Sequence, residues 1–299
     1  MDLNGVLIED TFAEAFPMRA TRVLITADEP RLAMTAATAM TGFATSVIAC
    51  GCEAGIEREL KPDETPDGRP GVAVLLFAMS DKDLATQLVT RVGQCVLTCA
   101  STACFAGLKG DANASLGKAL RFFGDGYQFS KKLGDRRYWR VPVMDGEFVV
   151  EDVTSVAPAV GGGNFLILGT SRAAVQASAE AAVVAMRQVP GVIMPFPGGI
   201  VRSGSKVGSK YKKLIASTND AFCPTLRAES PRSALPPEVD SVLEIVIDGL
   251  SEAGVAHATA VGVRAACGPG RKGGIVAISA GNYGGNLGPC HFHLRKVLA

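Results

Sequence analysis

The feature that most constrains this 299-residue chain is an internal repeat. Each half presents the order strand, helix, strand, strand, helix, strand, as judged from apolar periodicity and from the serines that precede helices. In the first half we expect strands at 22–26, 43–48, 72–77 and 94–98, and helices at 31–40 and 81–92. In the second half we expect strands at 164–168, 191–194, 242–247 and 275–278, and helices at 172–187 and from Ser251 to about 267.

This order of elements is that of the split βαβ, or ferredoxin-like, unit. Parallel crossovers would place both helices of each half on one face of its sheet. We therefore predict an α+β protein built from two duplicated ferredoxin-like lobes, residues 1–152 and 153–299. Residues 118–152 are expected to add inserted hairpin strands. Residues 196–238 form a long irregular stretch, and a loop of that length inside a compact lobe is usually functional.

Glu244 interrupts the most apolar strand of the second half, residues 241–247. Exposure to solvent on the open side of a sheet would be one sufficient explanation. When the halves are aligned on Ser80 and Ser251, however, Glu244 corresponds to Ala73, on a helix-free face that is apolar and needs a cover. A buried, unpaired carboxyl group takes up a proton, and the neutral acid can donate a hydrogen bond to a developing oxyanion. Glu244 is therefore our candidate catalytic residue.

Residues 196–213 form a cationic segment rich in glycine and serine, with no acidic residue between Gly198 and Asn219. Such a backbone approaches ligands closely, and its cations attract carboxylates or phosphates. A solvated flexible loop is the alternative. The spacing does not match a P-loop, and no alternation of basic and aromatic residues indicates nucleic acid. The candidate substrate-binding residues of this segment are Arg202, Ser205, Lys206 and Lys210.

Cysteines and histidines offer weaker candidates. The eight cysteines are expected to be reduced, several of them as core residues. Cys223 could act as a nucleophile, but such a thiol needs a base, and His257, His291 and His293 are the only histidines. Cys290, His291 and His293 are not accompanied by a second ligand cluster, so we expect no metal site.

Charge and hydropathy exclude two classes of partner. The formal net charge of +1 argues against a uniform polyanion-binding surface, and therefore against nucleic acid. No apolar run is long enough to span a bilayer, and the N-terminus is polar and acidic. We expect a cytoplasmic protein without membrane association.

Over nearly its whole length the chain resembles the formylmethanofuran:tetrahydromethanopterin formyltransferases. The matching stretches are residues 8–16, 41–48, 64–71, 93–95, 122–127, 162–165, 195–201, 217–220, 244–247 and 279–285. The resemblance implies two ferredoxin-like lobes and a homo-oligomer, dimer or tetramer, with the active site in a cleft at a subunit contact. Its motifs add Gln94, Asn219, Asp220, Asn282 and Tyr283 to the substrate-binding candidates.

The resemblance also implies a reaction. A formyl group would move between the amine of methanofuran, or a methanofuran-like carrier, and N5 of tetrahydromethanopterin by direct attack in a ternary complex. Both carriers would be co-substrates, and no tightly bound cofactor is implied. Glu244 would lie at the reacting formyl group, where the protonated acid could donate to the oxygen of the tetrahedral intermediate.

Three features qualify the resemblance. Cys99-Ala100 replaces an expected Ala-Pro, and Asn286 replaces the usual lysine, so one contact to a carrier tail is expected to differ. The nearly neutral charge fits a bacterial member working beside formylmethanofuran hydrolase subunits. Two alternatives stay open: a non-catalytic small-ligand-binding subunit of a one-carbon enzyme complex, and a cysteine-dependent amide hydrolase using Cys223.

Overall fold

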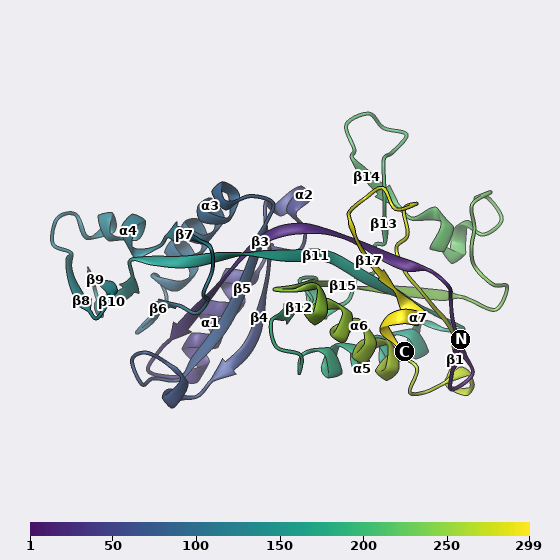
Figure 1. Ribbon diagram of the computed structural model, residues 1–299, viewed down its shortest axis with the longest axis horizontal. Helices are drawn as coiled ribbons and strands as arrows, with labels where there is room; N and C mark the ends of the chain where they lie inside the picture. Colours follow the sequence, from purple (N-terminus) through teal and green to yellow (C-terminus); the bar gives the residue numbers. More distant parts are fainter.

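One large sheet dominates the protein. The computed structural model describes residues 1–299 and shows seven α-helices, with 15 strands in a single mixed sheet and two in a separate hairpin. The two longest strands, β3 (Phe12–Thr26) and β11 (Val153–Gly169), lie antiparallel and run through both halves of the molecule (Figure 1). The fold is therefore mixed α+β, as the sequence predicts. None of the helices is long and apolar enough to cross a membrane.

In the first half, β3 is followed by α1 (Pro30–Thr41), β4 (Glu53–Leu60), β5 (Gly71–Ala78), α3 (Asp81–Arg91) and β6 (Ala103–Ala106). The strands are hydrogen-bonded in the order β6–β3–β5–β4, all antiparallel. Ser80 caps α3, because its hydroxyl accepts a hydrogen bond from the Asp83 backbone N–H at 3.1 Å. Both helices share an apolar core with alternate residues of β5.

The second half repeats this arrangement with β11, α5 (Arg172–Met186), β12 (Val192–Ile193), β15 (Ser241–Gly249), α6 (Glu252–Ala266) and β16 (Ile275–Ser279). Its strand order is β16–β11–β15–β12, again antiparallel. Serines 171 and 251 cap α5 and α6. Ile245 and Ile247 of β15 join the core beneath these helices, so Glu244 lies on the opposite, helix-free face.

Both ends of the chain pack on the second half. Strand β1 (Asp2–Leu3) pairs with β2 (Val6–Ile8), and β2 runs parallel to β16. Near the C-terminus, β17 (Cys290–His293) pairs with the beginning of β3 and leads into the short helix α7 (Leu294–Val297). The opening residues therefore extend the strand order β16–β11–β15–β12, whose strands all lie more than 140 residues later in the sequence.

Two predicted strands are wrong. Residues 43–48 contain no strand: Phe43 has a left-handed φ of 50°, Val47–Cys50 forms the short helix α2, and the strand starts only at Glu53. Phe43 is 80% exposed, so its apolar character did not signal burial. Residues 94–98 also form no strand, because Val92–Val96 continues α3 as a π-helical turn and the strand β6 follows later.

The segment 107–152 extends the first half of the sheet. Hairpin strands β9 (Arg136–Val143) and β10 (Gly146–Glu151) form as predicted, and β10 pairs with β6. Strand β8 (Phe129–Leu133), which was not predicted, pairs with β9. Strand β7 (Ala112–Ser115) pairs with β11. The beginning of the stretch expected to add hairpin strands, residues 118–152, is instead helical, made of α4 (Gly117–Leu120) and a 3₁₀ turn.

The inserted residues 196–238 cover the helix-free face of the second half. Strands β13 (Ser205–Val207) and β14 (Ala216–Thr218) form an arm that rises from the body of the molecule (Figure 1). Beyond the arm, Leu235 packs with Val239 against Leu166 and Leu168 of β11. The alignment of the two halves predicts that the helix-free face carrying Glu244 is covered, and the inserted residues of the same chain provide this cover. In the first half, Ile193 of the other half contributes to the cover over Leu75 and Phe77.

Candidate active site

Glu244 occupies the middle of β15 and is held on both sides. Strand β11 pairs with one edge of β15, with Leu166 opposite Glu244. On the other edge, Val201 exchanges two backbone hydrogen bonds with Glu244, with N···O distances of 2.7 and 2.9 Å. The residue is only 9% exposed. The predicted candidate is thus a covered carboxyl group on a strand whose backbone is fixed.

The carboxyl group of Glu244 has an amide partner but no ion pair. Its Oε1 accepts a hydrogen bond from Asn164 Nδ2 at 3.1 Å, and no basic side chain lies within salt-bridge distance. Burial raises the pKa of Glu244 to about 7, although the Asn164 donor lowers it in part. Near neutral pH the group is therefore divided between acid and carboxylate, which suits proton transfer.

The loop after β16 comes up to Glu244 from the other side. The Oδ1 atom of Asn164 accepts a hydrogen bond from the Gly281 backbone N–H at 2.7 Å. Burial, with the nearby Glu244 and Glu14, raises the pKa of Tyr283 to about 12, so its phenol is neutral. The Tyr283 hydroxyl donates to the Ser205 carbonyl at 2.9 Å, which joins this loop to the arm.

Glu14 of β3 anchors the same loop from beneath. It is fully buried, and its carboxylate accepts backbone hydrogen bonds from Tyr283, from Gly285 at 2.9 Å and from Leu287 at 2.6 Å. Burial alone would raise the pKa of Glu14, but these donors and the charge of His291 bring it below its usual value. Sequence reasoning missed both Glu14 and Asn164. The signal for Glu14 was the one that revealed Glu244, a charged residue within an apolar strand.

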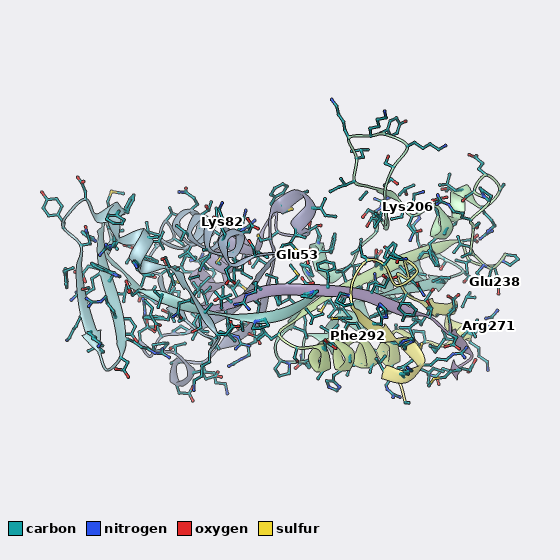
Figure 2. All side chains as sticks on the ribbon, turned by 45° about the horizontal axis from the view of Figure 1, so that its top comes forward. Glu53, Lys82, Lys206, Glu238, Arg271 and Phe292 are labelled. Atoms are coloured by element: carbon teal, nitrogen blue, oxygen red, sulfur yellow. The ribbon has the colours of Figure 1, made fainter.

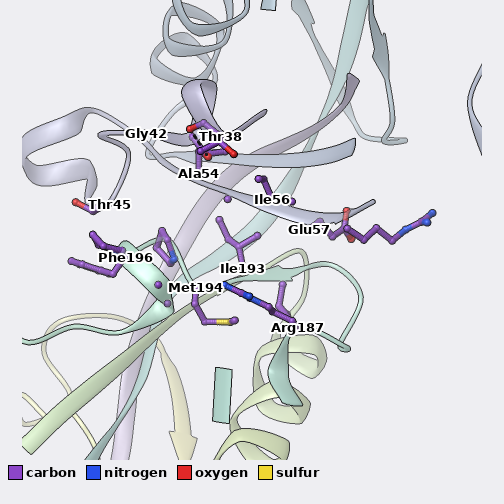
Figure 3. Close-up of a pocket in the computed structure, with 18 of the residues that line it drawn as sticks. Thr38, Gly42, Thr45, Ala54, Ile56, Glu57, Arg187, Ile193, Met194 and Phe196 are labelled. Carbon is purple, nitrogen blue, oxygen red and sulfur yellow. Dashed lines mark hydrogen bonds between the residues drawn. The ribbon is translucent and has the colours of Figure 1, made fainter. Parts of the chain in front are cut away.

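Two cavities lie near this region. A small one of about 40 Å³ is lined by Glu244 together with Leu166, Val201, Arg202, Ser203, Gly204, Asn219, Phe222, Cys223, Val242 and Leu243. A larger one of about 780 Å³ lies between the halves, lined by α1, β4 and residues 187–199 (Figure 3). Glu244 does not line the larger cavity, although Gly199 on its wall is two residues from Val201. The assignment of the site therefore rests on the chemistry of Glu244 and not on cavity size.

The other predicted residues lie at different distances from this centre. Arg202 and Asn219 line the small cavity with Glu244. Ser205 reaches the site through its carbonyl, and Asn282 donates from its side chain to the Thr11 hydroxyl at 3.2 Å. Gln94 lies on the π-helical turn of the first half and lines neither cavity.

Lys206 and Asp220 form an ion pair at the base of the arm (Figure 2 labels Lys206). Asp220 also accepts hydrogen bonds from Arg232 at 2.8 Å and from Ser230 at 2.7 Å. The Lys206 contact, with these donors, lowers the pKa of Asp220 well below its usual value. The charge of Lys206 is therefore already compensated within the chain, whereas Lys210 lies exposed near the tip of the arm.

The structure gives Cys223 no base. Its thiol donates to the Asn219 carbonyl at 3.2 Å. His291 and His293 pack on the ring of Phe12, at centroid distances of 4.7 and 5.0 Å, and no histidine is hydrogen-bonded to the thiol. This argues against the cysteine-dependent hydrolase. All eight cysteines are free, and no group of three or more histidine, cysteine or acidic side chains could hold a metal ion.

A titratable carboxyl group and an amide on a covered sheet face, with a phenol on the adjoining loop, define an acid–base site of the kind that acyl-transfer enzymes use on a carbonyl oxygen. Comparison with known proteins narrows this class. The family described as formylmethanofuran-tetrahydromethanopterin formyltransferase matches residues 1–143, and its second model, described as FTR, proximal lobe, matches residues 146–297. The chain therefore belongs to the formylmethanofuran–tetrahydromethanopterin formyltransferase family.

Individual relatives agree with this assignment. A formylmethanofuran–tetrahydromethanopterin formyltransferase of Methylococcus capsulatus is 65% identical over the full length of both chains. The formyltransferase/hydrolase complex from Methylorubrum extorquens, solved with methylofuran, contains a chain that superposes with a TM-score of 0.97 at 57% identity, covering 100% of this chain and 99% of that one. The Methanosarcina barkeri formyltransferase gives a TM-score of 0.93 at 47% identity, covering 99% and 100%.

Proposed function

We propose that this protein is an N-formyltransferase that moves a formyl group between methanofuran, or a methanofuran-like carrier, and N5 of tetrahydromethanopterin. The named relatives carry this activity in their descriptions and match along the whole chain. The observation within the structure that carries the proposal is Glu244, a covered carboxyl group with no ion pair and a pKa raised by burial to about 7.

The chemistry follows from that carboxyl group. The acceptor nitrogen attacks the formyl carbon, and the carbonyl π electrons move onto oxygen to give a tetrahedral intermediate. Protonated Glu244 donates a hydrogen bond to this oxygen, where charge develops. When the carbonyl re-forms, the bond to the donor nitrogen breaks, and that nitrogen takes a proton, for which Glu244 is the source. The proton lost by the acceptor nitrogen restores the acid, so the enzyme ends the cycle unchanged.

We propose that the fold is a duplicated ferredoxin-like unit, divided at residues 152 and 153. The equal strand orders β6–β3–β5–β4 and β16–β11–β15–β12, each with two helices, support this. The division follows the repeat in the sequence. The packing crosses it, because β3 and β11 belong to both halves.

The arm is proposed to bind the acidic ends of the carriers. Arg202, Lys210, Lys212 and Lys213 form no ion pair within the chain, so their charges are available. Ser205, Asn219, Asn282 and Tyr283 are proposed to contact the carriers nearer the reacting group, and Gln94 only if a second subunit brings it there. Lys206 and Asp220 are proposed to act through the shape of the arm.

The protein is proposed to be a cytoplasmic homo-oligomer that also assembles with formylmethanofuran hydrolase subunits. The similar chain from Methylorubrum extorquens belongs to a formyltransferase/hydrolase complex. In this chain, Phe43 and Ile48 on the first half, and Tyr211 and Ile215 on the arm, are 61–80% exposed. Apolar side chains exposed to this extent are typical of surfaces that another subunit covers.

The activity is tested by assaying formyl transfer with Glu244→Gln and Cys223→Ala. The glutamine of the first variant keeps the shape but supplies no acidic proton, so we expect kcat to fall about 10²- to 10⁴-fold with little change in KM. Cys223→Ala should turn over normally. A wild-type protein that binds both carriers without turnover would instead support the non-catalytic subunit, and full activity in Glu244→Gln would refute the mechanism.

A further inference from the structure

We propose that Asn164 is a positioning residue that orients the Glu244 carboxyl group and assigns its proton to the oxygen left open to substrate. The inference rests on the catalytic role proposed for Glu244. Asn164 is 5% exposed and lies on β11, two residues from the position opposite Glu244 on β15. Residues at such diagonal positions share a sheet face and are within reach of each other.

Two contacts leave only one orientation for the Asn164 amide. The backbone N–H of Gly281 can only donate, and it lies 2.7 Å from Oδ1. The amide nitrogen therefore faces Glu244 and donates to Oε1 at 3.1 Å. The reversed amide would set two donors against each other at Gly281. The hydrogen-bond network thus fixes the assignment of oxygen and nitrogen.

The proton of neutral Glu244 follows from this orientation. Oε1 accepts from Asn164, so the acidic hydrogen belongs on Oε2. Oε2 has no hydrogen-bond partner in the protein, yet it is not among the enclosed polar atoms that lack one. Because Glu244 lines the small cavity, Oε2 is the oxygen available to a substrate. Asn164 therefore determines which of the two oxygens acts as the acid.

The loop after β16 is fitted to Asn164. A Cβ atom at residue 281 would lie 2.4 Å from Asn164 Nδ2, closer than side chains approach one another. Only glycine lets the loop come near enough for its N–H to hold the amide. The contact with Gly281 is independent of Glu244 and supports the same role for Asn164.

The sister half shows why an uncharged donor matters. The pairing of Leu24 with Ala73 corresponds to that of Leu166 with Glu244, which places Arg22 where Asn164 lies. Arg22 forms a bidentate ion pair with Glu57, in which both N···O distances are 2.6 Å. A guanidinium at residue 164 would favour the ionised form of Glu244. The amide holds the carboxyl group in place and leaves it able to titrate.

The test compares the pH dependence of kcat in Asn164→Ala and Asn164→Asp with that of the wild type. Asn164→Asp retains an acceptor for Gly281 but replaces the donor to Glu244 by a second carboxyl group, so the loop stays anchored while the midpoint should move further than in Asn164→Ala. Both variants remove a donor that lowers the pKa of Glu244, and we expect the midpoint of the pH profile to move to higher pH. The expected fall in kcat is about 10- to 100-fold, with KM for both carriers nearly unchanged. Asn113→Ala, at an exposed position of strand β7, is the matched control.

The outcomes are distinct. Wild-type kcat and an unmoved pH midpoint in both variants would overturn the proposal, as would a loss of kcat without any shift of the midpoint. If Asn164→Ala does not fold, Asn164→Leu, which removes both amide contacts without adding a charge, takes its place. If Glu244→Gln keeps full kcat, the catalytic role of Glu244 fails. If Glu244→Gln is inactive while the Asn164 variants behave as wild type, only the role of Asn164 fails.

Discussion

Replacement of Asp248 by asparagine should make the protein more stable at alkaline pH. Asp248 of β15 is fully buried and faces Glu53 of β4, at the contact between the halves (Figure 2 labels Glu53). Asp248 Oδ1 accepts from the Gly162 N–H at 3.0 Å, and Glu53 Oε1 accepts from the Val47 N–H at 3.1 Å. The remaining oxygen of each carboxyl group has no other partner. The two groups are therefore arranged to share one proton.

The sign of the effect follows from linkage. Burial, followed by the charge of Glu53, raises the pKa of Asp248 well above its usual value, and burial raises that of Glu53. The folded state thus holds a proton that the unfolded chain releases above about pH 4. This stabilisation is complete below that pH and is lost as the pH rises towards the folded pKa. One retained proton corresponds to a slope of about 1.4 kcal/mol per pH unit within this window.

The Asp248→Asn substitution would remove the shared proton and so reduce the slope. The oxygen of the new amide keeps the Gly162 contact, and its nitrogen donates to the Glu53 carboxylate without a shared proton. In urea unfolding followed from pH 5 to pH 9, the variant should match the wild type at the acidic end and exceed it at the alkaline end. Asp240→Asn, an exposed carboxyl group just before the same strand, is the control. Equal slopes in Asp248→Asn and wild type would refute the shared proton.

Three further predictions concern other buried groups. Glu14→Gln removes the carboxylate that accepts hydrogen bonds from three backbone N–H groups. Hydrogen exchange at Gly285 and Leu287 should therefore accelerate, and kcat should fall because Tyr283 is released. Unchanged hydrogen exchange would contradict this prediction. Glu57→Gln breaks the ion pair between Arg22 of β3 and Glu57 of β4, and it weakens the contact to the Gly191 N–H. We expect a loss of about 2 kcal/mol in the free energy of urea unfolding, less than for a fully buried pair because Arg22 is partly exposed. A change within experimental error would show that the pair does not affect stability. In the wild type, kcat should fall as pH rises through the Glu244 pKa of about 7, and a profile flat from pH 6 to pH 8 would be inconsistent with an acid at this position.

The sequence predicted those helices and strands that are marked by apolar periodicity or by a capping serine. The paired serines at 80 and 251 located α3 and α6, and the apolar runs at 72–77 and 242–247 located the central strands. The predicted strand at 43–48 failed because Phe43 is an exposed apolar residue with a left-handed backbone, and no local pattern distinguishes it from a buried one.

The site was predictable to a similar extent. Glu244 was chosen as the candidate because it breaks an apolar strand. Asn164 was not, because an asparagine at the first position of a predicted strand resembles a turn residue, and its role depends on Gly281, 117 residues away. The pair formed by Lys206 and Asp220 is likewise invisible to reasoning from composition, which counts cations without their partners.

The pairing of β2 with β16 and of β17 with β3 has a consequence for biosynthesis. At about 5–20 residues per second, the ribosome needs tens of seconds to pass from β2 to β17. Until then, the first strands of the nascent chain present an uncovered edge, and such edges invite pairing with other chains. The first half can bury its own core on the way, but the half that carries Glu244 can close only after synthesis is nearly finished. Release from the ribosome, and not the emergence of the first lobe, is therefore the moment at which this enzyme acquires its site.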